Sequence, residues 1–140
     1  MTECLPFFVY GTLRPGERNH DLLLRGRVTG EEPATLAGAV LYEGPGFPYA
    51  LSAPPGSVIT GDLVTPRPGT YDETLTLLDR LEGYYGPGDP RNLYDRIARD
   101  VCRPDGSTAR AWVYLTAEKA ARELRAHGRV IPGGEWPGGR

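Results

Sequence analysis

An acidic side chain on an apolar helix face is the strongest chemical feature of this 140-residue chain. Residues 70–83 have the pattern of an amphipathic helix, and with Leu75 as origin Glu82 falls at about 340°, close to Leu78 at about 300°. Glu82 also lies in the last turn, where the helix dipole disfavours an anion. Burial and the dipole both raise a carboxyl pKa from about 4.3 toward the roughly 6–7 of a working acid or base. Two alternatives stay open: Glu82 turns outward at the helix end, or it pairs with an arginine such as Arg96.

A loop after the first apolar run is the second candidate. The run Leu5-Pro-Phe-Phe-Val-Tyr10 stops at Gly11, and Thr12 and Leu13 follow. Gly11 permits a positive φ and the close approach of a ligand. Successive N–H groups in such a turn can form a nest that binds an anion, and a small carboxylate would suit it. An ordinary turn is the alternative.

The elements that must position these residues follow from periodicity and turn signals. Strands are predicted at 5–10, 34–42 (buried on both faces), 58–64, 94–102 and 108–115. The Pro-Asp-Gly turn within residues 103–107 predicts that the last two form a hairpin. Helices are predicted at 70–83, with Thr70 and Glu73 as a capping box and Gly83 just past the end, and at 116–127, closed by Gly128. A short helix capped by Asn19 is predicted to run to Leu24. The stretches 44–56 and 84–93, rich in Gly and Pro, are predicted loops.

Composition sets the fold class. Gly and Pro number 19 and 14, which disfavours a helical bundle, while 39% hydrophobic and 24% charged residues are ordinary for a globular protein. The order of elements predicts an α+β fold, a small mixed, mostly antiparallel β-barrel with flanking helices. We expect residues 1–140 to form a single domain, with a partly extended tail from about residue 129.

Charge and cysteine usage narrow the function classes. The net charge of −2 and scattered arginines predict neither a nucleic-acid partner nor a membrane surface as partner. The run 5–10 is far too short to span a membrane. Cys4 and Cys102 form no CxxC pair and no disulfide framework, so we expect a cytoplasmic protein with both thiols as buried packing.

Three motifs, taken together, resemble the γ-glutamylcyclotransferase-like family, which includes the AIG2-like proteins. They are Phe8-Val-Tyr10-Gly-Thr-Leu-Arg-Pro-Gly16, Leu78-Asp-Arg-Leu-Glu82-Gly83-Tyr84, and Tyr94-Asp-Arg96 followed by Ala111-Trp-Val-Tyr114. Gly38, Tyr42, Pro48 and the run 58–63 with Gly61 fit between them. The resemblance covers residues 7 to about 115 and implies the barrel fold predicted above.

The resemblance also implies a reaction and roles for six residues. The substrate's own α-amine attacks its γ-glutamyl carbonyl and releases 5-oxoproline and an amine or amino acid, so the enzyme is of the transferase or lyase type. Glu82 is the implied acid/base, and the backbone of Gly11, Thr12 and Leu13 the implied holder of the glutamyl α-carboxylate. Tyr10 and Tyr94 are implied to line the site. No cofactor and no metal are implied, because the substrate carries its own nucleophile.

Other interpretations stay open beside this one. The same pocket could bind a small carboxylate without turning it over, or could hydrolyse a γ-glutamyl amide with water. A thiol nucleophile pairing Cys4 or Cys102 with His20 or His127 has no local signature, and the same residues lack metal-ligand spacing.

Several details are left undetermined. His20 is expected to have a surface role, and Arg96 to pair with a substrate carboxylate or a neighbouring acid. Trp112 and Tyr114 could pack in the barrel or line a pocket. The segment 84–93 is longer than the family's usual spacing, so the leaving group stays open, as does the choice between monomer and homodimer.

Overall fold

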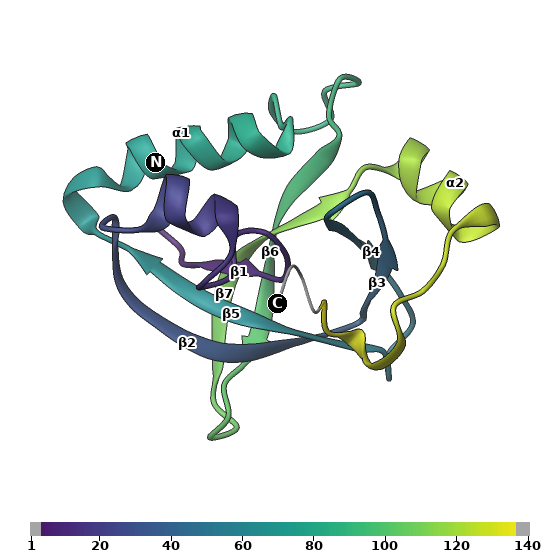
Figure 1. Ribbon diagram of the computed structural model, residues 1–140, viewed down its shortest axis with the longest axis horizontal. Coiled ribbons are helices and arrows are strands. Elements are labelled where there is room, and N and C mark those ends of the chain that lie inside the picture. Colours follow the sequence, from purple (N-terminus) through teal and green to yellow (C-terminus); the bar gives the residue numbers. More distant parts are fainter. Residues whose placement is uncertain (1–3, 137–140) are drawn as a thin grey trace.

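Strand β1 (Phe7–Val9) is buried along its whole length because it lies in the wall of a barrel whose outer face is covered at this point. The computed structural model describes residues 4–136. Its five-stranded barrel closes in the order β1–β5–β2–β6–β7, with β7 returning to β1 (Figure 1). All these pairs are antiparallel except β1–β7, which is parallel. The predicted α+β fold, a mixed and mostly antiparallel barrel with flanking helices, is confirmed.

The other elements follow along the chain. The strands are β2 (Val28–Ala37), β3 (Ala39–Glu43), β4 (Pro48–Ser52), β5 (Val58–Pro66), β6 (Tyr94–Cys102) and β7 (Thr108–Thr116). The helices are α1 (Tyr71–Glu82) and α2 (Glu118–His127), and three short helical turns are η1 (His20–Leu24), η2 (Pro68–Thr70) and η3 (Pro132–Gly134).

Side-chain alternation along the strands produces two apolar cores. Phe8 points into the barrel and packs in the first core with residues such as Leu63 and Val113. Phe7 and Val9 face the other way, into a second core that includes Leu78 of α1. Figure 1 shows α1 lying across the outside of the barrel, and α2 beyond the β3–β4 pair. Residues of both cores line the pocket of the candidate site, among them Phe8 of the first core and Val9 of the second.

Two predicted elements next to the site are confirmed. The turn Arg103-Pro-Asp-Gly-Ser107 joins β6 to β7 in an unbroken antiparallel register from Tyr94↔Thr116 to Cys102↔Thr108. Helix α1 ends at Gly83, which takes the left-handed conformation (φ 65°) and donates its N–H to the Arg80 and Asp79 carbonyls. This end fixes the direction in which Glu82 leaves the helix.

Two strand predictions were wrong because of local glycine and proline geometry. The expected single strand at 34–42 is divided at Gly38, whose φ of 77° turns the chain from β2 into β3. The expected loop at 44–56 contains β4, which pairs with β3 in a separate two-stranded sheet. Proline is tolerated at the first position of a strand, and Pro48 begins β4.

Smaller corrections concern the helix starts. Asn19 makes no side-chain cap to η1, because its backbone is helical (φ −77°, ψ −25°) rather than extended as at an N-cap. Its side-chain amide donates to Thr12 Oγ1. Thr70 precedes α1, but its hydroxyl makes no capping bond, so the predicted capping box with Glu73 is absent. The predicted first strand shortens to β1, and Thr116 belongs to β7 rather than to the last helix.

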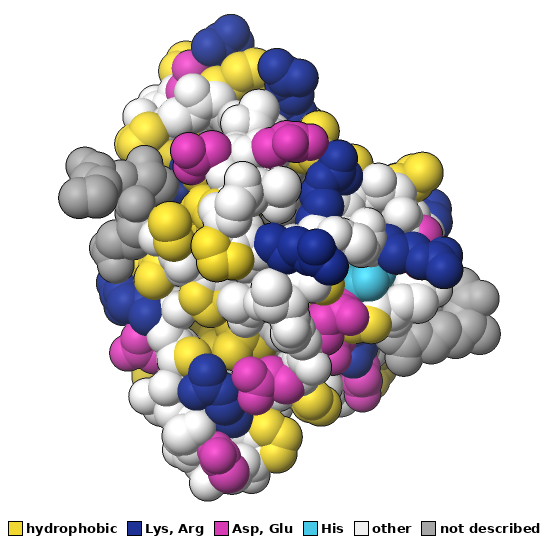
Figure 2. All heavy atoms as spheres, turned by 90° about the vertical axis from the view of Figure 1, so that its left-hand side faces the viewer, with side chains coloured by type: hydrophobic (Ala, Val, Ile, Leu, Met, Phe, Trp, Pro, Cys, Tyr) yellow, Lys and Arg dark blue, Asp and Glu magenta, His cyan; other side chains and the backbone are white. Residues whose placement is uncertain are grey.

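The surface and the tail complete the description. On the face shown in Figure 2 acidic and basic side chains are interspersed rather than gathered by sign. Within residues 4–136 no helix is both long and apolar enough to cross a membrane. Ile131 of the predicted tail is buried and donates its N–H to the Leu41 carbonyl, whereas residues 137–140 of that tail lie outside the described residues.

Candidate active site

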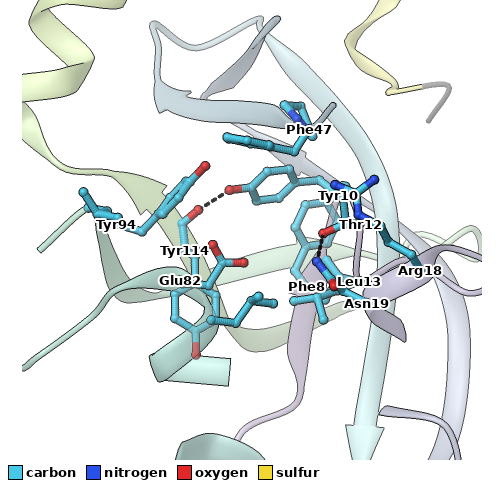
Figure 3. A pocket seen from close by; sticks show the side chains of 15 residues that line it. Phe8, Tyr10, Thr12, Leu13, Arg18, Asn19, Phe47, Glu82, Tyr94 and Tyr114 are labelled. Atoms are coloured by element: carbon cyan, nitrogen blue, oxygen red, sulfur yellow. Dashed lines mark hydrogen bonds between the residues drawn. The ribbon is translucent and has the colours of Figure 1, made fainter. Parts of the chain in front are cut away.

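All six residues singled out from the sequence line one pocket of about 230 Å³. Its walls come from β1 and the loop after it, the β3–β4 connection, the end of α1 and the start of β6 (Figure 3). The expected residues are Tyr10, Gly11, Thr12, Leu13, Glu82 and Tyr94, and the others are Phe8, Val9, Arg18, Asn19, Phe47, Pro48, Leu81, Leu93 and Tyr114. Residues far apart in sequence therefore meet at this one hollow.

Glu82 reaches the pocket from the last turn of α1, between Tyr94 and Tyr114 (Figure 3). Burial raises the pKa of its carboxyl from 4.5 to about 7, since desolvation disfavours the charged form. Arg96 is not its partner, because the guanidinium Nε donates to Asp79 Oδ1 at 2.9 Å. Glu82 points into the pocket rather than away from the fold, so neither alternative considered for it holds.

Three tyrosines surround this carboxyl. The Tyr10 hydroxyl donates to the Tyr114 backbone carbonyl at 2.5 Å, which fixes the Tyr10 ring across the top of the pocket (Figure 3). Burial raises the pKa of Tyr10, Tyr94 and Tyr114 above the usual tyrosine range, and the nearby Glu82 charge adds to each shift. The three side chains are therefore neutral phenols at physiological pH and add no second negative charge next to Glu82.

A charge cluster beneath the pocket holds one of these tyrosines. Asp79 Oδ1 accepts a hydrogen bond from the Tyr114 hydroxyl at 2.7 Å as well as the one from Arg96. The Arg96 guanidinium also stacks on the Trp112 ring, 4.4 Å from its centroid. The sequence left undecided whether Trp112 and Tyr114 pack in the barrel or line a pocket. Trp112 packs against α1, where its indole N–H donates to the Tyr71 hydroxyl. Tyr114 lines the pocket, with its hydroxyl turned away to Asp79.

The loop after β1 is folded back on itself. The Thr12 carbonyl accepts the backbone N–H groups of Asn19 and His20, both at 3.1 Å, and the Asn19 side chain donates to Thr12 Oγ1 at 2.7 Å (Figure 3). Within residues 4–136 the N–H groups of Gly11, Thr12 and Leu13 donate to no other group of the chain. Three successive donors thus remain for a bound anion.

Gly11 is required in this loop for a different reason from the one expected. Its φ is not positive; instead a Cβ at this position would lie 2.7 Å from Pro48 Cδ, closer than real contacts allow. The loop therefore packs directly against the start of β4. This contact depends on β4, which the sequence did not predict.

An ion triad centred on the buried Arg14 fixes the same loop. Arg14 is 6% exposed, and its Nε donates to Asp62 Oδ2 of β5 at 2.7 Å. Its Nη1 donates to Glu135 Oε2 at 3.0 Å. The loop that carries the free N–H groups is thus tied both to the barrel wall and to the chain near residue 135.

The other candidate residues lie outside the pocket lining. His20 is buried and pairs with Glu31, so the expected surface role was wrong. Cys4 and Cys102 are free and exposed, not buried packing, and neither lines the pocket. In the described part of the chain no three His, Cys, Asp or Glu side chains are grouped so as to hold a metal ion.

Several pocket residues were missed from the sequence. Phe47 and Pro48 come from the stretch read as a loop, Leu81 lies inside the 78–84 motif but was not singled out, and Arg18, Asn19 and Leu93 carry no local motif. Only Asn19 had a usable signal, since its place shortly after the Gly11 loop allows its side chain to reach back to Thr12. The others depend on contacts between distant segments.

The sequence and fold of this chain are similar to those of known proteins. The family model described as "Gamma-glutamyl cyclotransferase, AIG2-like" matches residues 7–138. The chain belongs to this family. The match includes every pocket residue named above, so the pocket is part of the family's domain.

Individual proteins similar to this chain are consistent with the family match. A "Gamma-L-glutamyl-butirosin B gamma-glutamyl cyclotransferase" from Niallia circulans is 38% identical over 108 residues, which cover 77% of this chain and 64% of that relative. The crystal structure of an AIG2-like protein from Mus musculus has a TM-score of 0.60 at 26% identity, covering 83% of this chain and 79% of the mouse chain. An uncharacterised protein from Pyrococcus horikoshii has the same fold, with a TM-score of 0.59 at 22% identity, covering 94% of this chain and 88% of the other.

Proposed function

We propose that this protein is a γ-glutamyl cyclotransferase that cleaves a γ-glutamyl amide by cyclisation, with Glu82 as the general acid and base. The single observation that carries the proposal is that the buried Glu82 carboxyl shares one pocket with Gly11, Thr12 and Leu13, whose N–H groups have no acceptor within residues 4–136. Burial raises the pKa of this carboxyl to about 7. Such a carboxyl can both accept and return a proton near neutral pH.

The reaction balances with this one group. The substrate's α-nitrogen forms a bond to the γ-carbonyl carbon, and Glu82 takes the proton that this nitrogen loses. The bond from the γ-carbon to the leaving nitrogen then breaks, and Glu82 returns the proton to that nitrogen. The products are 5-oxoproline and a free amine or amino acid, with no external nucleophile or cofactor consumed.

The loop after β1 supplies the second part of the proposal. The N–H groups of Gly11, Thr12 and Leu13 bind the glutamyl α-carboxylate, and Tyr10 and Tyr94 confine the glutamyl chain. Holding the glutamyl chain of the substrate in a folded conformation places its α-amine against its γ-carbonyl carbon. Well-oriented intramolecular reactions reach effective molarities of about 10⁵–10⁸ M. A poised acid/base adds about 10²–10⁴-fold.

A mass-spectrometric assay for 5-oxoproline tests the proposal. The purified protein is incubated with γ-glutamyl amino acids, γ-glutamyl amines and γ-L-glutamyl-butirosin B, the compound in the name of the Niallia circulans relative. Formation of 5-oxoproline supports cyclisation, whereas release of glutamate indicates hydrolysis by water. Saturable binding by calorimetry with no product from any compound would show a binding protein of the same fold.

We place the protein in the cytoplasm as part of this proposal. Cys4 and Cys102 are exposed free thiols, which suits a reducing compartment.

The pH dependence of the reaction reports on Glu82. Because the base must be ionised in the free enzyme, we expect kcat/KM to rise with pH along an acidic limb with a midpoint near 7. The measurement is kcat/KM from pH 4.5 to 9 with one good substrate. A midpoint at or below about 4, the range of an unperturbed glutamate, would contradict the assignment.

Substitution of Gly11 tests the loop. Gly11→Ala introduces a Cβ 2.7 Å from Pro48 Cδ, so the loop must move and its N–H groups lose their alignment. We expect KM to rise about 10-fold, the equivalent of about 1.4 kcal/mol, with a smaller change in kcat. Gly69→Ala is the matched control, since a Cβ there meets nothing within 4 Å. An unchanged KM in Gly11→Ala would remove the loop from the proposal.

A further inference from the structure

Two exposed leucines flank Glu82 at the pocket mouth. Leu81 is 41% exposed and Leu93 is 64% exposed, and both line the pocket. Leu81 directly precedes Glu82, while the Leu93 N–H donates to the Gly83 carbonyl at 3.0 Å. A Cβ on Gly83 would lie 2.9 Å from Leu93 Cδ1, so the Leu93 side chain rests on the end of α1. Large apolar groups left open in a pocket wall favour binding of apolar surface.

The long loop 84–93 holds Leu93 in this place. Asn92 is buried at its centre, accepts the Tyr85 backbone N–H at 2.7 Å, and donates to the Gly86 carbonyl at 2.8 Å. The Ala117 N–H donates to the Leu93 carbonyl at 3.0 Å. The loop is therefore fixed by its own hydrogen bonds, and the leucine surface exists before any ligand arrives.

Two arginines of the neighbouring segments are already paired. Arg91 donates through Nη2 to Asp89 Oδ2 at 2.9 Å, and Arg96 is held by Asp79. Among the pocket-lining residues, all of which lie in the described part of the chain, Arg18 is the basic one, and Figure 3 places it across the pocket from Glu82. A carboxylate beside Leu81 and Leu93 would thus have no cation of the pocket lining next to it and would face the Glu82 carboxyl.

We infer that Leu81 and Leu93 form the subsite for the leaving group, and that this subsite selects an uncharged, apolar amine. The inference rests on the proposed function, because it places the glutamyl α-carboxylate at the loop after β1 and the leaving nitrogen at Glu82. The carbon chain beyond that nitrogen, up to its fourth atom, then meets the two leucines. A hydroxyl or a carboxylate at this point loses water without gaining a partner.

Three γ-L-glutamyl amides of nearly equal size test the inference. Their leaving amines are butylamine, 3-hydroxypropylamine, in which a hydroxyl replaces the terminal methyl group, and norvaline, which is butylamine with a carboxylate on its first carbon. We expect kcat/KM for the butyl amide to exceed that of the other two by about 10-fold or more. Equal values for all three, with 5-oxoproline formed, would overturn the inference and leave the proposed function standing.

A charged substitution locates the subsite. Leu93→Lys places an ammonium group beside Glu82, and we expect the ratio of kcat/KM for the norvaline amide to that for the butyl amide to rise about 10-fold. The control is Leu22→Lys, since Leu22 is 72% exposed and outside the pocket lining, and its ratio should equal that of the wild type. An unchanged ratio in Leu93→Lys would overturn the subsite. Absence of 5-oxoproline from these amides and from the whole panel above would overturn the proposed function and this inference together.

Discussion

Glu82→Gln is expected to reduce 5-oxoproline formation by about 10²–10⁴-fold while leaving the fold intact. Glutamine has nearly the same size and shape as glutamate. Its amide, however, can neither take the proton from the α-amine nor return it to the leaving nitrogen. The measurement is kcat by mass spectrometry under saturating substrate, with circular dichroism as the check on folding.

A matched control separates the chemistry from the change of charge. Glu73 lies on the same helix but in its first turn, with an exposed side chain paired to Arg27, so Glu73→Gln removes one negative charge far from the pocket. It should retain the wild-type kcat. If Glu82→Gln turned over substrate as fast as this control, the mechanism would be wrong.

The same substitution changes stability in a pH-dependent way. The pKa of Glu82 is about 7 when folded and 4.5 in the reference state, so between these values the folded state binds more protons. Wild-type stability therefore falls as pH rises from 4.5 to 7, by up to about 3 kcal/mol. Glu82→Gln has no carboxyl to titrate, so its free energy of unfolding should rise relative to that of the wild type between pH 5 and pH 8. The measurement is urea unfolding of both proteins at both pH values. A constant difference between the two proteins would show that burial does not raise the pKa.

Sequence reasoning succeeded where the decisive interactions are local. The helical period placed Glu82 on the face that includes Leu78, and that face packs on the barrel. The turn at 103–107 fixed both strands of the β6–β7 hairpin. In these cases one helix or one hairpin contains all the information needed.

It failed where a residue is explained by a distant partner. Gly11 is a glycine because of Pro48, and Pro48 begins a strand that exists only through its pairing with β3. Gly38 divides an apolar run that by composition alone reads as one strand. Arg14 likewise has no local signature, because its partners Asp62 and Glu135 are 48 and 121 residues away in sequence.

Arg14→Met is expected to produce the largest loss of stability, because it removes the buried centre of the triad with Asp62 and Glu135. Methionine fills most of the space of the arginine stem but leaves the Asp62 carboxylate, with a 16% exposed side chain, without its partner. Breaking a buried ion pair from one side costs about 3–5 kcal/mol, which for a chain of this size lowers Tm by roughly 10 °C or more. The measurement is thermal unfolding followed by circular dichroism.

Arg110→Met is the matched control. It also breaks an arginine–aspartate pair, but the Arg110 and Asp100 side chains are 56% and 68% exposed, so water replaces the lost partner and Tm should not change. A Tm for Arg14→Met as high as that of this control would show that the triad does not stabilise the fold.

A double variant identifies the cause of the loss. If the unpaired Asp62 carboxylate is responsible, Asp62→Asn should destabilise the wild type yet recover part of the stability of Arg14→Met. KM gives the functional counterpart: Arg14 lies directly after Leu13, so its loss should loosen the N–H groups of the loop and raise KM even well below Tm. Recovery of stability by Asp62→Asn without recovery of KM would show that Arg14 holds the loop in position as well as stabilising the barrel wall.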